Sequence, residues 1–127
     1  MAFNNLTPVI QQLTLQMMVS LSAGQAVPFD TLFQPQNFDG SGWDFTGIAG
    51  ATLYVDNAQN GAARIAQTFT VSYAEHDTGG LLVHLTSAQV QAIAAAGSSQ
   101  GKFTLVVTDG TSSVIVAAGS FSVATLA

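Results

Sequence analysis

Glu75, His76, Asp77 and His84 are the nearest approach in this sequence to a metal or acid–base site. A metal centre needs histidine and carboxylate ligands that converge from several segments of the chain. His76 and Asp77 are adjacent, so a strand sends them to opposite faces and a turn exposes both. His84 is expected on the next strand, on its outward face. We therefore interpret these residues as a surface hairpin with two unrelated histidines.

A second group of oxygen-bearing side chains lies in the stretch Asp39-Gly40-Ser41-Gly42-Trp43-Asp44. Alternate oxygen ligands suit Ca²⁺, but the EF-hand loop needs more carboxylates and a final glutamate. Asx-turn chemistry explains an Asp-Gly pair without any ion. The sequence therefore predicts a turn here and no metal site.

The residue sets for hydrolytic chemistry are missing from the chain. One string, residues 97–101, has the Gly-x-Ser-x-Gly spacing, but it follows the expected helix and precedes a strand, whereas a nucleophile elbow joins a strand to a following helix. A glycosidase needs two carboxylates in a cleft, whereas Glu75 is the only glutamate and the aspartates mostly fall in turns. The absence of cysteine excludes thiolate catalysis and Cys-based zinc sites. We predict no catalytic, cofactor-binding or metal-binding residues, and no enzymatic activity.

Aromatic residues are concentrated in the stretch from residue 29 to residue 45, which holds Phe29, Phe33, Phe38, Trp43 and Phe45. Aromatic side chains bury a large area each, so they serve as core anchors for a long loop. They are also enriched at the centres of protein–protein interfaces. Both interpretations remain open, and these five residues are the candidate interface. Sugar binding by an exposed Trp43 is a further alternative.

Charge is scarce in this chain. It has seven acidic residues and two basic ones, Arg64 and Lys102, which gives a net charge of −5. Two cations cannot replace the counterions of a phosphate backbone or bind an anionic membrane, so neither nucleic acid nor membrane is an expected partner. No apolar run approaches the roughly 20 residues of a membrane-spanning helix. The N-terminus does not resemble a secretory signal, so we expect synthesis in a cytoplasm.

The same composition is typical of a subunit of a larger protein assembly. Charged residues make up 7% of the chain and hydrophobic ones 48%, whereas soluble domains carry about 25% charged residues. A free monomer usually depends on mixed surface charge for its solubility. We expect a homo-oligomer, or a subunit bound to other proteins.

The apolar pattern predicts an all-β fold with one short helix. Alternation of apolar and polar residues predicts strands over residues 13–21, 28–33, 51–56, 63–73, 81–85, 102–108, 113–118 and 121–126. Thr86 and Gln89 form a capping box, which starts a helix over residues 87–96 that Gly97 ends. Gly119 suggests a bulge.

These elements fit one domain. Residues 1–50 are expected to give a strand and an aromatic-rich interface segment, and residues 51–127 the sandwich core. The fold class is an antiparallel, immunoglobulin-like β-sandwich with one short capping helix, and a small barrel is the alternative.

The order of elements from residue 44 to residue 123 resembles the immunoglobulin-like module of phage baseplate and tail-fibre proteins, as in the N-terminal domain of lactococcal upper-baseplate proteins. The matching stretches are Asp44-Phe45-Thr46-Gly47, the strands over 51–56, 63–73 and 81–86, Ser87-Ala88-Gln89, the strand over 102–107, Thr108-Asp109-Gly110 and the strand over 114–123. The early part of this chain is longer, more apolar and more aromatic than in that family.

The resemblance implies a structural subunit of a bacteriophage virion, made in the host cytoplasm. Its partners would be other virion proteins and copies of itself, in the tail, baseplate or fibre. Two alternatives stay open: a capsid decoration (cement) protein that stabilises the head, and a carbohydrate- or receptor-binding module.

Overall fold

Nine strands and one helix make up the part of the chain that the structure describes. The computed structural model describes residues 8–20, 25–57, 65–76, 79–95 and 100–126. The expectations for the N-terminus, Leu21, residues 58–64, Asp77 and Gly97 lie outside these residues. In chain order the elements are β1 Gln11–Ser20, β2 Gln25–Ala26, β3 Phe29–Phe33, β4 Gly50–Asn57, β5 Ile65–Thr70, β6 Ser72–His76, β7 Gly80–Leu85, α1 Ser87–Ala94, β8 Gln100–Thr108 and β9 Ser113–Leu126.

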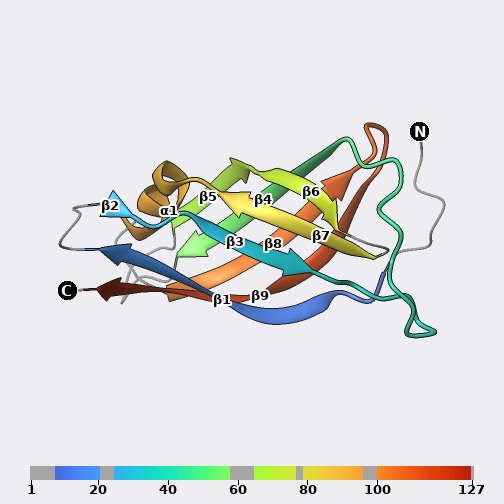
Figure 1. Ribbon diagram of the computed structural model, residues 1–127, viewed down its shortest axis with the longest axis horizontal. Helices are drawn as coiled ribbons and strands as arrows, with labels where there is room; N and C mark the ends of the chain where they lie inside the picture. Colours follow the sequence, from blue (N-terminus) through green and yellow to red (C-terminus); the bar gives the residue numbers. More distant parts are fainter. Residues whose placement is uncertain (1–7, 21–24, 58–64, 77–78, 96–99, 127) are drawn as a thin grey trace.

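The strands form two sheets that pack face to face as a sandwich (Figure 1). The larger sheet has the order β2-β1-β9-β8-β4-β5, and the smaller one has the order β3-β7-β6. The all-β sandwich with a single helix is therefore confirmed. The segment before Gly50 belongs to the sandwich itself, since β1 lies in the larger sheet and β3 in the smaller.

The connectivity is immunoglobulin-like. In that fold, strands B, E and D form part of one sheet, and strands G, F and C form the other, which a C′ strand extends. Here β3-β7-β6 take the places of B-E-D, and β9-β8-β4-β5 take the places of G-F-C-C′. One pair departs from an all-antiparallel arrangement, because β1 runs parallel to β9 from the pair Gln11–Ala117 to the pair Ser20–Leu126.

The core lies between the two sheets, and both inner faces supply it with apolar side chains. From the larger sheet come Leu53, Phe103 and Leu105, and from the smaller sheet Phe33 and Leu81, each at most 2% exposed. The rings of Phe33 and Phe103 meet across the sandwich, with centroids 6.3 Å apart. Burying a large apolar side chain contributes about 1.5–3 kcal/mol, so this layer is the main source of stability.

The capping box at the start of α1 is confirmed. Thr86 Oγ1 accepts a hydrogen bond from the Gln89 backbone N–H at 3.2 Å, and Gln89 Oε1 accepts one from the Thr86 N–H at 2.9 Å. Val90 and Ile93 face the core and are fully buried. The helix ends at Ala94, two residues before the expected end at residue 96, and Ala95 is its C-cap.

Side-chain hydrogen bonds attach α1 to both edges of the larger sheet. Ser87 Oγ donates to the Ala26 carbonyl on β2 at 2.6 Å. On the other side, Gln67 Nε2 of β5 donates to the Ala92 carbonyl at 3.2 Å. The helix therefore covers one open end of the core, as the sequence suggests.

The expectation of one strand over residues 63–73 is wrong. The structure holds two strands here, β5 in the larger sheet and β6 in the smaller, with Val71 between them. Val71 is buried and its N–H donates to the Ala51 carbonyl at 3.1 Å. Phe69, Val71 and Tyr73 all point to the same core. Apolar alternation therefore continues through the crossing and hides it.

The bulge lies elsewhere than at Gly119. The register of β8 and β9 shifts between Leu105 and Val106, which pair with Ala117 and Ile115, so Val116 is the extra residue. Gly119 serves the parallel pair instead, because a Cβ there would lie 1.9 Å from the Leu13 carbonyl oxygen. The glycine thus allows β1 to approach β9, and β9 runs unbroken.

Candidate functional site

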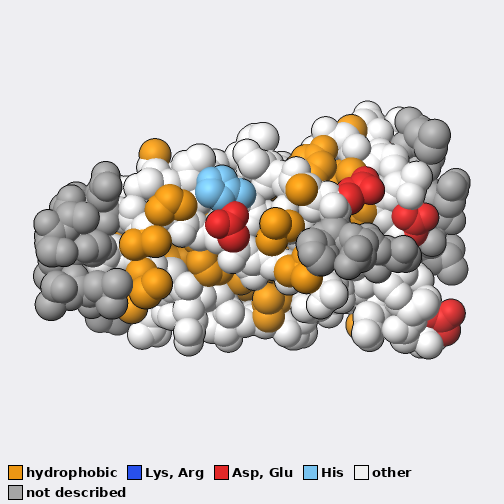
Figure 2. Space-filling view, in the orientation of Figure 1, with side chains coloured by type: hydrophobic (Ala, Val, Ile, Leu, Met, Phe, Trp, Pro, Cys, Tyr) orange, Lys and Arg blue, Asp and Glu red, His pale blue; other side chains and the backbone are white. Residues whose placement is uncertain are grey.

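The histidine and carboxylate residues do not converge. His84 Nδ1 lies 2.7 Å from Asp30 Oδ1 on the outer face of the smaller sheet, where β3 and β7 pair these two residues. Figure 2 shows histidine and carboxylate side chains meeting on this face among uncharged neighbours. Glu75 is exposed on β6; the His76 side chain and Asp77 lie outside what the structure describes. An exposed pair of side chains of this kind contributes little to stability.

Asp39 and Asp44 each bind their own turn. Asp39 Oδ1 accepts hydrogen bonds from Ser41 Oγ at 2.5 Å and from Ser41 N–H at 2.9 Å. Asp44 Oδ1 accepts the same pair of bonds from Thr46, at 2.6 and 2.9 Å. These bonds stabilise the carboxylates, so the pKa of each lies below its ordinary value. Within the described residues no group of three or more His, Asp or Glu is placed to hold a metal ion.

The five aromatic candidates divide between the core and the surface. Trp43, Phe33 and Phe45 are 0%, 1% and 3% exposed, and Phe29 is half-buried against the core. Trp43 and Phe45 pack edge to face, with ring centroids 5.0 Å apart. Phe38 is 86% exposed. Burial thus supports a core role for three of the five residues. Phe38 is accessible for contact with another molecule, whereas the buried Trp43 ring is not accessible to a sugar in this structure.

Phe38 sits at the tip of a loop that is tied together by its own hydrogen bonds. Gln36 and Gly42 form a β-bridge at its base. Above the bridge, Asn37 N–H donates to the Ser41 carbonyl at 2.8 Å, and Gly40 N–H donates back to the Asn37 carbonyl at 3.0 Å. The loop is therefore a short, closed turn that presents Phe38 to solvent.

The base of this loop is anchored in the core. Pro35 and Trp43 flank it and are buried, and Trp43 N–H donates to the Pro35 carbonyl at 3.0 Å. Val9 joins the same end of the molecule, since its N–H donates to the Gln36 carbonyl at 2.8 Å. The loop lies at the end of the long axis opposite α1 (Figure 1).

The outer face of the larger sheet is almost uncharged. Strand alternation and register place Ser, Thr, Gln and Ala side chains over most of it, with Tyr54, Val106 and Ile115 among them. Among the described outward residues of β1, β9, β8, β4 and β5, only Lys102 and Asp56 are charged. The sequence shows that charge is scarce but does not by itself show which face lacks it. The Thr and Ser residues at alternate positions of the strands are the feature from which this uncharged face could have been predicted.

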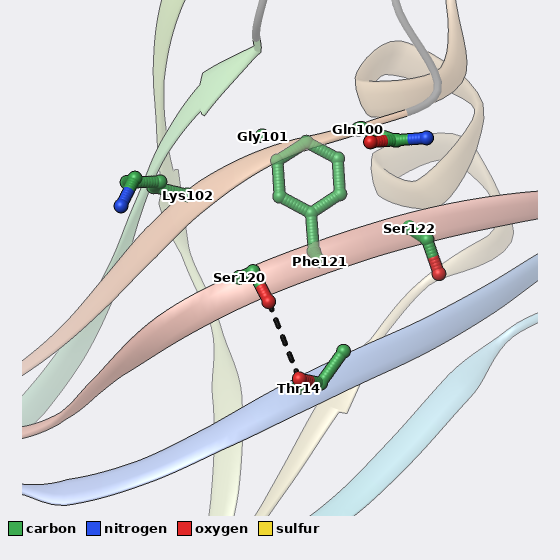
Figure 3. Close-up of a pocket in the computed structure, with 7 residues that line it drawn as sticks. All are labelled: Thr14, Gln100, Gly101, Lys102, Ser120, Phe121 and Ser122. Atoms are coloured by element: carbon green, nitrogen blue, oxygen red, sulfur yellow. Dashed lines mark hydrogen bonds between the residues drawn. The ribbon is translucent and has the colours of Figure 1, made fainter.

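A hollow of about 280 Å³ opens on this face across β1, β9 and β8. It is lined by Thr14, Gln100, Gly101, Lys102, Ser120, Phe121 and Ser122 (Figure 3). Lys102 and Gln100 extend on either side of Gly101, and Ser120 Oγ and Thr14 Oγ1 lie 3.2 Å apart below them. Short side chains on β9 and β1 leave this space open, whereas the place of a side chain at Gly101 is filled by the Phe121 ring, which is 2% exposed.

The fold defines this chain as an immunoglobulin-like β-sandwich protein whose larger sheet has an almost uncharged outer face among its described residues. No protein-family model matches the chain, and no curated protein matches its sequence. Within the described residues, no helix has the length and apolar character needed to cross a bilayer.

Proposed function

We propose that this chain is a structural, non-enzymatic subunit of a bacteriophage virion that docks by protein–protein contacts in the tail, baseplate or fibre. The observation that carries the proposal is the almost uncharged outer face of the six-stranded sheet. Interface cores are depleted of charged residues relative to the rest of a protein surface. A wide sheet face with one lysine and one aspartate at its described outward positions matches that composition.

The energetics of desolvation support docking on this face. Burying an unpaired charge is costly, whereas a hydroxyl or amide can be buried at low cost once it finds a hydrogen-bond partner. Thr104 and Thr52 supply such groups beside Tyr54, which is 45% exposed. A partner strand or sheet can therefore cover this part of the face without burying unpaired charges.

The virion assignment is supported by the order of elements that resembles the phage module, and by the immunoglobulin-like connectivity of the strands. The other candidate placements are outcomes of one localisation experiment. Purified particles would be labelled with antibodies against this chain and viewed by electron microscopy. We expect label on the tail or baseplate; label over the head would indicate a decoration protein, and absence from particles would contradict the proposal.

The docking face is tested by adding charge to it. Tyr54→Arg places a cation in the middle of the neutral face, and Ala74→Arg makes the same change on the outer face of the smaller sheet as a control. We expect Tyr54→Arg to lower incorporation into particles at least about tenfold, as hot-spot residues do, and Ala74→Arg to leave it unchanged. Normal incorporation of Tyr54→Arg would show that another surface docks the subunit.

A further inference from the structure

The most exposed large apolar side chain in the described structure belongs to a loop that is closed by its own hydrogen bonds. Phe38 is 86% exposed, while the other large apolar residues at the surface range from 37% to 45%. Its turn is held by the Gln36–Gly42 bridge and by bonds from Asn37 and Gly40. Rigid presentation of an aromatic side chain lowers the entropy lost on binding.

A carboxylate follows Phe38 in the same turn. Asp39 is exposed, and its Oδ1 is fixed by two hydrogen bonds from Ser41. Among the described loop residues 34–43 there is no Lys or Arg. The loop therefore offers an apolar ring and a fixed negative charge together. The matching surface is an apolar hollow with a cation at its rim.

The same chain has a hollow with a lysine in its lining; its accessible surface is mostly apolar, although all its side chains other than that of the buried Phe121 are polar. The hollow lined by Gly101, Phe121 and Ser120 also holds Lys102 (Figure 3). Lys102 is the one Lys or Arg side chain that the structure describes, and it forms no ion pair with the described residues. The hollow has a volume of about 280 Å³, just below the range of about 300–1,000 Å³ that is typical of small-molecule sites, and one aromatic side chain fits within it.

The loop and the hollow cannot meet within one molecule in this fold. The Phe38 loop lies at the end of the long axis away from α1, whereas β8 begins at Gln100 on the α1 side (Figure 1). A contact between them must therefore join two copies. Two different patches would meet, so the contact is head-to-tail, and repetition gives a ring or a filament.

We propose that Phe38 of one copy inserts into the hollow around Gly101 and Phe121 of the next copy, with Asp39 beside Lys102. The inference rests on the proposed function in that it names a second copy of this chain as one docking partner. The ring supplies most of the affinity, because exposed ion pairs contribute little. The ion pair sets the orientation of the loop in the hollow.

Complementation between two defective variants tests this contact. Phe38→Ser removes the inserted ring, and Ser120→Arg fills the hollow from an exposed position on β9. We expect the wild-type chain to show a mass in sedimentation equilibrium that rises with concentration above the monomer value of 13.1 kDa. Each variant alone should associate at least roughly 30-fold more weakly.

A one-to-one mixture of the two variants retains one intact contact, the Phe38 of the Ser120→Arg chain against the open hollow of the Phe38→Ser chain. The mixture should therefore form dimers and nothing larger. Ser113→Arg is the matched control, since it lies outward on the same strand, about 23 Å from Ser120 at ~3.3 Å per residue, and should self-associate like the wild type. Circular dichroism on each variant checks that the fold is kept.

Three results would overturn the inference: a wild-type chain that stays monomeric at all concentrations, self-association that survives Phe38→Ser, or variants that do not complement. A monomeric chain that is nevertheless found in particles would leave the proposed function standing with a different partner for Phe38. A chain that complements as expected but is absent from particles would overturn the proposed function and keep the head-to-tail contact.

Discussion

Gly101 on β8 lies directly opposite Phe121 on β9, and the phenyl ring occupies the space that a side chain at Gly101 would need. A Cβ at Gly101 would lie 2.5 Å from Phe121 Cε2 and 2.2 Å from the Asp56 carbonyl oxygen on β4. An aromatic residue that covers a cross-strand glycine compensates for the missing side chain. The pair fixes the spacing of three neighbouring strands.

Gly101→Ala should therefore be strongly destabilising. The added methyl meets the backbone of β4, which cannot move without disturbing the sheet, so we expect a loss of about 3 kcal/mol in the free energy of unfolding. Gly50→Ala is the control, because its Cβ would meet only Thr108 Cγ2, at 3.4 Å, and should change stability by less than about 1 kcal/mol. Urea denaturation measures both; equal effects would contradict the packing described for Gly101.

The core and surface members of the aromatic stretch should respond oppositely to the same substitution. Phe33→Ser leaves a cavity beside Phe103 and should cost about 3–5 kcal/mol. Phe38→Ser removes an exposed ring and should change the free energy of unfolding by less than about 0.5 kcal/mol. Thermal or urea unfolding of the two variants checks this. Loss of folding in Phe38→Ser would show that this ring is structural.

The pattern of apolar and polar residues predicts the strands and the helix of this chain, but not which of the two sheets each strand joins. The alternation of Leu53 and Val55 and the capping box of Thr86 and Gln89 each depend on neighbours in sequence, and both are confirmed. The crossing at Val71 could not be predicted, because both sheets face one core and the apolar period continues through it.

The candidate site was predictable only in part. The density of aromatics in residues 29–45 is visible in the sequence, but whether a ring points inward depends on tertiary contacts. Trp43 is buried through its bond to Pro35 and its packing on Phe45. Phe38 is exposed because the bridge between Gln36 and Gly42 closes the loop beneath it. The hollow needs three strands in register, which no local pattern specifies.

The free energy of unfolding at acid pH should depend on the protonation of Asp44. Its pKa lies below the ordinary value of 3.8, first because the Thr46 hydroxyl donates to the carboxylate and then because the Thr46 N–H does. A lowered folded-state pKa means that the carboxylate stabilises the fold above pH 3.8, and that this contribution is lost as the pH falls through the lower folded value.

Asp44→Asn removes this dependence while keeping an oxygen acceptor at the same place. The stability of the wild-type chain should therefore fall more steeply than that of the variant as the pH is lowered below about 4. Thr46→Val removes the hydroxyl donor and should reduce the slope in the same direction. Urea unfolding at a series of pH values gives the comparison, and parallel curves for all three chains would show that Asp44 makes no such contribution.

If the chain docks as proposed, its assembly should be only weakly sensitive to salt. Exposed ion pairs weaken as ionic strength rises, because screening shortens the reach of charges to about 8 Å at physiological salt. The neutral sheet face offers Lys102 and Asp56 as its charged groups among the described outward residues, and the contact proposed for Phe38 is made mainly by its ring, so apolar burial and neutral hydrogen bonds would dominate both surfaces. Apolar burial does not weaken with salt in this way, and sulfate or phosphate strengthens it.

The measurement is retention of the subunit on its particle at neutral pH, from low salt to about 1 M NaCl, where the screening length falls to about 3 Å. We expect retention throughout, with Lys102→Ala changing it little. Release at high salt would instead show that exposed carboxylates such as Asp30 and Glu75 dock against a basic neighbour.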